Sequence, residues 1–143
     1  MTTTTTTIEA RGRVIGIGGI FLKSSDHDRL RSWYWNNLGL DHENEYSQFK
    51  WRSHEKPEVE HVTAWSVFPA DSTYFNPSNA PFMINYIVDD LDAILAKLAG
   101  SGVRVDTKRE DYDYGRFAWI FDPDGNKIEL WEPSSHVEQS PAG

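Results

Sequence analysis

The same order of helix cap, helical stripe and glycine occurs twice in this chain, about 63 positions apart. Asp26 precedes apolar residues at helical spacing, and Gly39 comes just after the last of them. Asp89 and Asp90 precede a second such stripe, which Gly102 follows 63 positions after Gly39. Aspartate favours helix N-caps and glycine favours the left-handed C-cap. An internal repeat of this length predicts two similar structural units.

Each predicted helix follows an apolar run rich in β-branched residues, which is typical of a buried strand. We expect helices near 27–38 and 90–100. The patterns predict strands near 14–23, 41–45, 47–52 and 61–68 in the first half, and near 82–88, 103–107, 116–121 and 127–132 in the second. Each half therefore reads βαβββ, and the fold class is α+β.

Polar segments divide the chain into five parts. We expect a disordered tail over 1–12, a first module over 13–69, a linker loop over 70–81, a second module over 82–133 and a C-terminal tail over 134–143. The linker loop is long for so small a chain, and long loops are often functional. Tyr74 and Phe75 in its middle are too apolar for a simple spacer, so we expect them to fold back over the sheet.

Charge and cysteine usage exclude several function classes. The 143 residues carry a formal net charge of −8, which argues against a nucleic-acid or anionic-membrane partner. The chain has no cysteine, so it has no disulfide, thiolate zinc site, iron–sulfur cluster or cysteine nucleophile. No apolar run approaches the length of a membrane helix, and the threonine-rich start lacks the apolar region of a secretory signal. We therefore expect a cytoplasmic protein.

The composition is rich in aromatic residues, with six Trp, six Tyr and seven Phe. Such residues favour strands and supply large contact areas. They indicate a β-rich core, an apolar ligand cavity, or both.

Three segments together resemble one known superfamily. Residues 115–130, with Asp122-Pro123-Asp124-Gly125-Asn126 as a hairpin turn, resemble the C-terminal motif of the vicinal oxygen chelate superfamily. Residues 86–92 resemble its strand-to-helix junction, and residues 26–39 resemble the same junction and helix in the first half. That superfamily includes glyoxalase I, fosfomycin and bleomycin resistance proteins and extradiol dioxygenases.

The resemblance implies two βαβββ modules that form a cupped eight-stranded mixed sheet. It also implies a divalent metal in the cup, held by a histidine on the first strand and a glutamate on the last strand of each half. Such a metal chelates vicinal oxygens of a substrate and acts as a Lewis acid.

Most of the implied metal ligands are missing from this sequence. Glu129 stands at the position of the second-half carboxylate, but Gly19 and Met83 stand where the histidines are expected. The last strand of the first half offers no imidazole or carboxylate on the side chains expected to face the cup, Thr63, Trp65 and Val67. We therefore predict no cofactor and no metal site, with Glu129 as the one surviving candidate ligand. A divalent metal recruited through other histidines remains the alternative.

Glu129 is the residue on which a catalytic role would rest. Strand alternation places it on one face with Lys127 and Trp131, while Ile128 and Leu130 face the helices. A buried carboxylate needs a partner. Glu129 is therefore a ligand, a proton-transfer group, or half of an ion pair with Lys127 or Arg116.

The same alternation predicts an aromatic and apolar pocket with few polar groups, as small-molecule sites commonly have. The predicted ligand-binding residues are Phe21, Trp65, Met83, Asn85, Tyr114, Arg116 and Trp131. The alternative is that these side chains only fill the cup, with Arg116 paired to Asp111 or Asp113.

The sequence thus leads to two hypotheses. The first is a glyoxalase or bleomycin-resistance-like protein with a degenerate metal site, which binds a small, partly apolar organic molecule. The second is a metal-dependent or Glu129-based lyase, isomerase or dioxygenase of the same superfamily. The expected partner in both is a small molecule, and the sequence leaves open whether the protein is a monomer or a homodimer.

Overall fold

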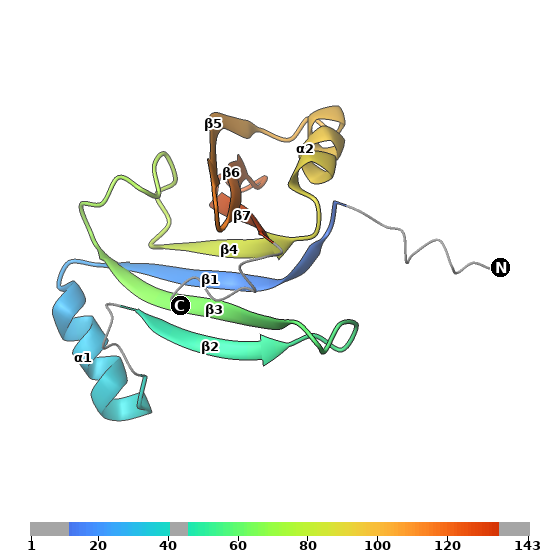
Figure 1. Cartoon of the computed structure of the whole chain (residues 1–143). Coiled ribbons are helices and arrows are strands. Elements are labelled where there is room, and N and C mark those ends of the chain that lie inside the picture. The colour runs from blue at the N-terminus through green and yellow to red at the C-terminus, as the bar shows by residue number, and fades with distance from the viewer. Residues whose placement is uncertain (1–11, 41–45, 135–143) are drawn as a thin grey trace.

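The computed structural model describes residues 12–40 and 46–134, which form one mixed sheet flanked by two helices (Figure 1). The elements follow one another in the order β1 (Val14–Ser24), α1 (His27–Leu38), β2 (Ser47–Arg52), β3 (Glu60–Pro69), β4 (Phe82–Val88), α2 (Leu91–Gly100), β5 (Val105–Tyr112), β6 (Gly115–Phe121) and β7 (Lys127–Pro133).

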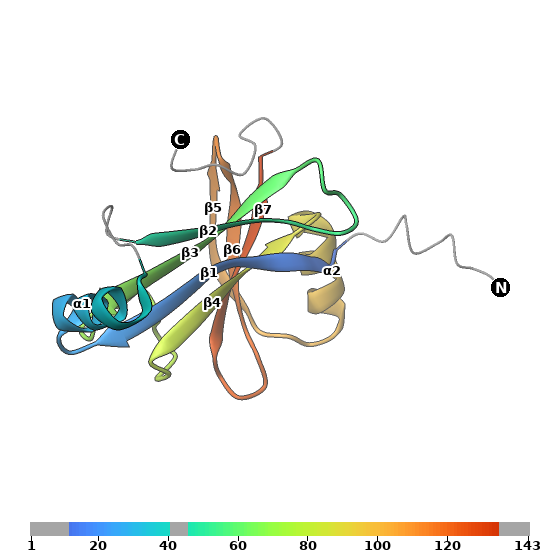
Figure 2. The same cartoon turned by 90° about the horizontal axis from the view of Figure 1, so that it is seen from below.

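The sheet joins the two halves of the chain through β1 and β4. Its seven described strands lie in the order β2-β3-β1-β4-β7-β6-β5. Within each half the first strand pairs in parallel with the last, β1 with β3 and β4 with β7, while β1 and β4 pair antiparallel. Seen from below, the strands of the two halves are strongly rotated against one another (Figure 2), as the twist of sheets requires.

Both helices form at the predicted positions and begin after the predicted capping residues. The Asp26 carboxylate accepts a hydrogen bond from the Arg29 backbone N–H, and Gly39 ends α1 in the left-handed region with φ of +71°. The Asp90 carboxylate accepts from the Ala93 backbone N–H at 3.0 Å and starts α2. These contacts satisfy amide groups that a helix end leaves without partners.

The strand register defines two faces. Glu129, Asn85, Gly19 and Ala64 lie in register across β7, β4, β1 and β3, so they share the face that we call the inner face. Ile128, Ile84, Ile20 and Trp65 share the opposite, outer face in the same way.

The outer face carries the helices. Leu91 and Ile94 of α2 pack on Ala118, Ile120 and Leu130 of the sheet. On the other half, Tyr34 of α1 meets Trp65 with ring centroids 4.7 Å apart. The prediction that Ile128 and Leu130 face a helix is confirmed, since both belong to the α2 cluster.

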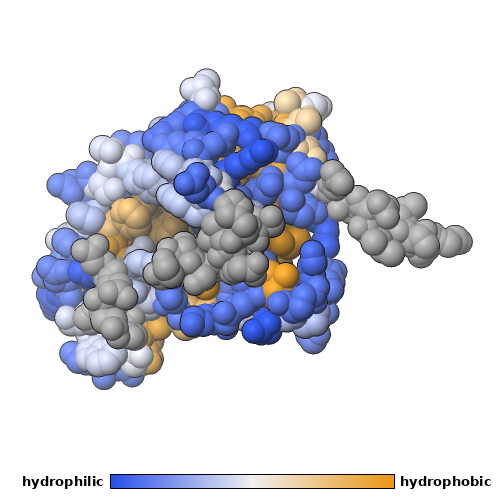
Figure 3. Space-filling model, in the orientation of Figure 1, coloured by the Kyte–Doolittle hydropathy of each residue, from blue (hydrophilic) through white to orange (hydrophobic). Residues whose placement is uncertain are grey.

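The linker loop turns onto the inner face. Phe75 is fully buried beside Met83 and Trp119, and Tyr74 packs against this cluster. This confirms the expectation that Tyr74 and Phe75 fold back over the sheet. The surface seen in Figure 3 is mostly hydrophilic, with hydrophobic side chains showing in separate areas.

The strand expected at 41–45 lies outside the described residues, so the eighth strand and the division into two modules stay predictions. The strand expected at 103–107 is β5, which runs on to Tyr112 because Tyr112 pairs with Gly115 in a tight hairpin with β6.

Candidate functional site

A buried carboxylate lies at the centre of the inner face. Glu129 of β7 is only 3% exposed. Its Oε1 accepts a hydrogen bond of 2.7 Å from Nδ2 of Asn85, and its Oε2 accepts one of 3.0 Å from Nε1 of Trp119. The strand register brings these partners together, because Asn85 on β4 and Trp119 on β6 are both paired with Glu129.

The third partner comes from the linker loop. The Tyr74 hydroxyl donates a short hydrogen bond to Oε2 of Glu129. Nζ of Lys127 donates to the Tyr74 backbone carbonyl at 2.9 Å, which ties the loop to β7. Glu129 forms an ion pair with neither Lys127 nor Arg116, the two partners considered for it. Lys127 donates to the loop, and Arg116 donates to Asp92 on α2 at 3.0 Å.

Burial governs the electrostatics of this centre. Removal from water raises the pKa of Glu129 above its usual range, and the three donors oppose that rise only in part. Burial and the neighbouring carboxylate together raise the pKa of Tyr74, so its hydroxyl stays a donor. Burial also lowers the pKa of Lys127. Burial thus makes the Glu129 carboxyl easier to protonate than an exposed glutamate.

The side chains of Asn85 and Trp131 both lie against Gly18, close to Glu129. A Cβ added to Gly18 would overlap Oδ1 of Asn85 and lie 3.0 Å from Cε3 of Trp131, so only glycine leaves room for both. Oδ1 of Asn85 and Nε1 of Trp131 are buried without a hydrogen-bond partner among the described residues. Buried polar atoms normally have partners, which makes this acceptor and this donor unusual.

An aromatic shelf continues from Trp131 to the surface. Phe117 is stacked with Trp131 at an interplanar angle of 4°, and Tyr112 is stacked with Tyr114 at 6°. Tyr112 and Tyr114 are 46% and 41% exposed, so the shelf ends at an open rim. The Tyr112 hydroxyl donates to Glu110 at 2.5 Å, which raises the pKa of Tyr112 to about 12.

The inner face holds five of the eight residues that the sequence nominated: Phe21, Met83, Asn85, Glu129 and Trp131. Phe21 and Met83 lie in the apolar cluster around Phe75. Because Phe75 belongs to the linker loop, the loop occupies this part of the inner face. Tyr114 lies on the rim of the aromatic shelf.

Trp65 and Arg116 lie elsewhere, and their predicted place in the pocket is wrong. Trp65 pairs with Ile20 and packs on Tyr34, so it faces α1. Arg116 alternates with Phe117 on β6 and reaches Asp92 of α2. In the described part of the chain, Arg116 forms its ion pair with Asp92 and with neither alternative partner, Asp111 or Asp113. The Asp111 carboxylate accepts from Arg109 instead.

The sequence analysis predicted none of the three partners of Glu129, although it placed Asn85 in the same pocket. Phe117, Trp119 and Phe121 occupy alternate positions on β6, so their side chains share one face of the strand. This alternation was the signal that could have placed Trp119 on the inner face. Tyr74 was expected over the sheet, but nothing in the loop sequence indicates which residue its hydroxyl would reach.

The residues at the implied metal positions do not fit a metal ion. The ring of Phe21 lies across Gly19, since a Cβ there would be 2.6 Å from Cζ of Phe21, and Met83 is enclosed by carbon atoms. Both oxygens of Glu129 face N–H or O–H donors. Within residues 12–40 and 46–134, no three histidine, aspartate or glutamate side chains gather as metal ligands would.

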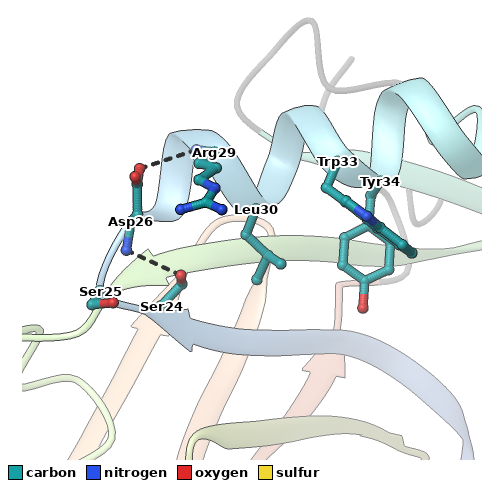
Figure 4. Close-up of a pocket in the computed structure, with 7 residues that line it drawn as sticks. All are labelled: Ser24, Ser25, Asp26, Arg29, Leu30, Trp33 and Tyr34. Atoms are coloured by element: carbon teal, nitrogen blue, oxygen red, sulfur yellow. Dashed lines mark hydrogen bonds between the residues drawn. The ribbon is translucent and has the colours of Figure 1, made fainter.

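A separate hollow of about 510 Å³ lies where β1 meets α1 (Figure 4). Its lining residues are Ser24, Ser25, Asp26, Arg29, Leu30, Trp33 and Tyr34. The polar groups there serve the helix start: Asp26 accepts from Arg29 and donates its backbone N–H to Ser24. We therefore take the Glu129 centre as the candidate site.

A curved mixed sheet with both helices outside and a buried carboxylate inside defines an α+β protein of the glyoxalase type. The chain belongs to the Glyoxalase/Bleomycin resistance protein/Dioxygenase superfamily, whose sequence model matches residues 16–130. A search of curated proteins found no match. No helix in the described ranges is long and apolar enough to cross a membrane.

Solved structures support the same fold. Methylmalonyl-CoA epimerase from Mycobacterium tuberculosis is 20% identical, with a TM-score of 0.53 over 90% of this chain and 94% of that one. A methylmalonyl-CoA epimerase variant from Streptomyces coelicolor, in complex with 2-nitronate-propionyl-CoA, is 18% identical, with a TM-score of 0.58 over 88% and 99%. The Mn(II)-bound glyoxalase from Novosphingobium aromaticivorans is 21% identical, with a TM-score of 0.53 over 84% of this chain and 39% of that one.

Proposed function

We propose that this protein binds a small, partly apolar organic molecule on the inner face of its sheet, without a metal. The observation that carries the proposal is the Glu129 carboxylate, which is buried on an otherwise apolar face and held by three donors rather than by a cation. A charged group so placed costs stability, and such groups cluster at functional sites.

The aromatic shelf supports the apolar part of the proposal. Phe117 and Trp131 offer ring faces, and the exposed Tyr112 and Tyr114 provide an entry from solvent. Small-molecule sites combine such walls with a few placed polar groups. The unpartnered Oδ1 of Asn85 and Nε1 of Trp131 would supply an acceptor and a donor beside Glu129 after a modest local shift.

A second candidate is a Glu129-based lyase or isomerase, favoured by the raised pKa of that carboxyl. A general base works best with a pKa near the working pH, and burial moves Glu129 in that direction. Within residues 12–40 and 46–134, metal-dependent chemistry has no support, because Glu129 already accepts three hydrogen bonds and no other metal-ligating side chains gather beside it. The cytoplasmic location stays a prediction, and the choice between monomer and homodimer stays open.

The test is ligand screening on the whole chain, by thermal shift and then calorimetry, with the variant Glu129→Gln. An inner-face ligand should bind the wild type and lose roughly ten- to a hundredfold in affinity in this variant, because a hydrogen bond to a charged group is lost. Glu58→Gln, which changes an exposed loop carboxylate, is the control and should bind normally. Equal binding by wild type and Glu129→Gln would contradict the proposal.

The same preparations separate the candidates. Loss of turnover in Glu129→Gln, with binding retained, would favour the enzyme. Elemental analysis after incubation with nickel, zinc or manganese should find no stoichiometric metal. A metal ion bound at full occupancy and lost in Glu129→Gln would overturn the proposal that the site works without a metal.

A further inference from the structure

The recess that holds the ring of Tyr74 is built mainly by side chains of the sheet, and Phe75 of the loop adds an edge contact with ring centroids 6.5 Å apart. Phe68 of β3 lies parallel to the ring, with centroids 5.7 Å apart and an interplanar angle of 4°. Trp119 of β6 stands perpendicular to it at 6.4 Å and 86°. Nζ of Lys127 lies 5.6 Å from the ring centroid. These walls are specific for an aromatic ring, because stacked and edge-to-face pairs and a cation–π contact all require a π system.

The end of the recess recognises a hydroxyl. Oε2 of Glu129 accepts the Tyr74 hydroxyl, and the same oxygen is oriented by Nε1 of Trp119 at 3.0 Å. Asn85 holds the other oxygen of the carboxylate at 2.7 Å. A ring without a hydroxyl would leave this buried acceptor short of one donor, which is costly. Walls and end together enclose the phenol ring and hydroxyl of Tyr74.

The Tyr74 side chain is more exposed than that of its neighbour Phe75. Both belong to the same loop, but Phe75 is fully buried and Tyr74 is only partly buried. Rotation of the Tyr74 side chain would therefore open the recess to solvent while Phe75 keeps the loop anchored.

We propose that this recess is the polar subsite of the inner-face ligand site, that it accepts a hydroxylated aromatic ring, and that Tyr74 is its tethered occupant in the ligand-free protein. This inference rests on the proposed function. The ligand's hydroxyl donates to Glu129 in place of Tyr74, its ring stacks on Phe68, and Tyr74 moves to solvent. Tyr74 then acts as an intramolecular competitor that only a ring with a matching hydroxyl can displace.

The experiment is calorimetric titration of the full chain with 4-methylphenol and with toluene, which differs by the hydroxyl. The wild type should bind one 4-methylphenol. Tyr74→Ala should bind it at least tenfold more tightly, because the tethered competitor is gone, and should bind toluene at least tenfold more weakly than 4-methylphenol. Tyr46→Ala, which removes a tyrosine next to the edge strand β2, should behave as the wild type.

Two further variants keep the test decisive. Tyr74→Phe retains the ring and should also bind 4-methylphenol more tightly than the wild type, which covers poor folding of Tyr74→Ala. Adding Glu129→Gln to either variant should remove most of the preference for 4-methylphenol over toluene.

Two results would overturn the subsite. The first is binding by Tyr74→Ala alone, which would mean that the substitution created an artificial cavity. The second is equal binding of toluene and 4-methylphenol. If the wild type instead binds a non-phenolic ligand in a Glu129-dependent way, the phenol subsite fails while the proposed function stands. If no ligand binds the inner face at all, both fail.

Discussion

Asn85 on β4 and Glu129 on β7 lie opposite one another on adjacent parallel strands, and the Asn85 amide donates to the Glu129 carboxylate at 2.7 Å. This pair joins the first and last strands of the second half on the inner face. It orients one carboxylate oxygen toward β4 and leaves the other for Trp119 and Tyr74.

Replacing Glu129 by Gln should change how stability depends on pH. Burial raises the pKa of Glu129 in the folded protein above the ordinary glutamate value of about 4.3. The folded state therefore binds this proton more tightly than the unfolded state does. The resulting contribution to stability is fully present below about pH 4 and is lost as pH rises through the folded pKa.

The measurement is urea unfolding of wild type and Glu129→Gln from pH 4 to pH 8. The free energy of unfolding of the variant should gain on that of the wild type as pH rises. Parallel curves would show that the carboxyl of Glu129 has an ordinary pKa.

Tyr74→Phe should destabilise the protein by about 1–3 kcal/mol, because it leaves a buried carboxylate oxygen without one of its donors. The ring remains, so its stacking on Phe68 should persist. Tyr114→Phe, which removes a hydroxyl from an exposed ring, is the matched control and should change stability little. Equal effects of the two variants in urea unfolding would contradict the Tyr74–Glu129 contact.

Gly18→Ala should destabilise the protein by roughly 1–3 kcal/mol through overpacking. The new methyl would overlap Oδ1 of Asn85 and press on Ile87 and Trp131, which displaces the Asn85 amide from Glu129. Gly100→Ala places a methyl in open space at the end of α2 and should be neutral or stabilising. The thermal unfolding midpoint should therefore fall in Gly18→Ala and stay unchanged or rise in Gly100→Ala, and a neutral Gly18→Ala would argue against the close approach.

Phe75→Ala should destabilise the protein by about 3–5 kcal/mol, since it empties a fully buried site in the cluster with Met83 and Trp119. Phe82→Ala serves as the control, because Phe82 is 38% exposed and should cost much less. Chemical denaturation gives both values. A small effect of Phe75→Ala would mean that the linker loop is not docked on the inner face in solution.

Local patterns in the sequence determined the helices and the position of Glu129. Asp26 and Asp90 mark helix starts because capping involves only the first turn, and Glu129 alternates with Ile128 and Leu130 because successive strand residues point to opposite faces. The family could be recognised from the same local segments.

Only the tertiary structure decided which set of alternating residues on β3 faces inward. Register against β1 turns Trp65 toward α1, and a one-residue change of register would reverse every side chain on the strand. The pairing of β1 with β4 is irregular between Ile17 and Gly19. Ile17 therefore pairs with Tyr86 and does not share the face of Gly19 and Phe21. The contact between Tyr74 and Glu129 joins residues 55 positions apart, so it depends on where the linker loop docks and no local pattern encodes it.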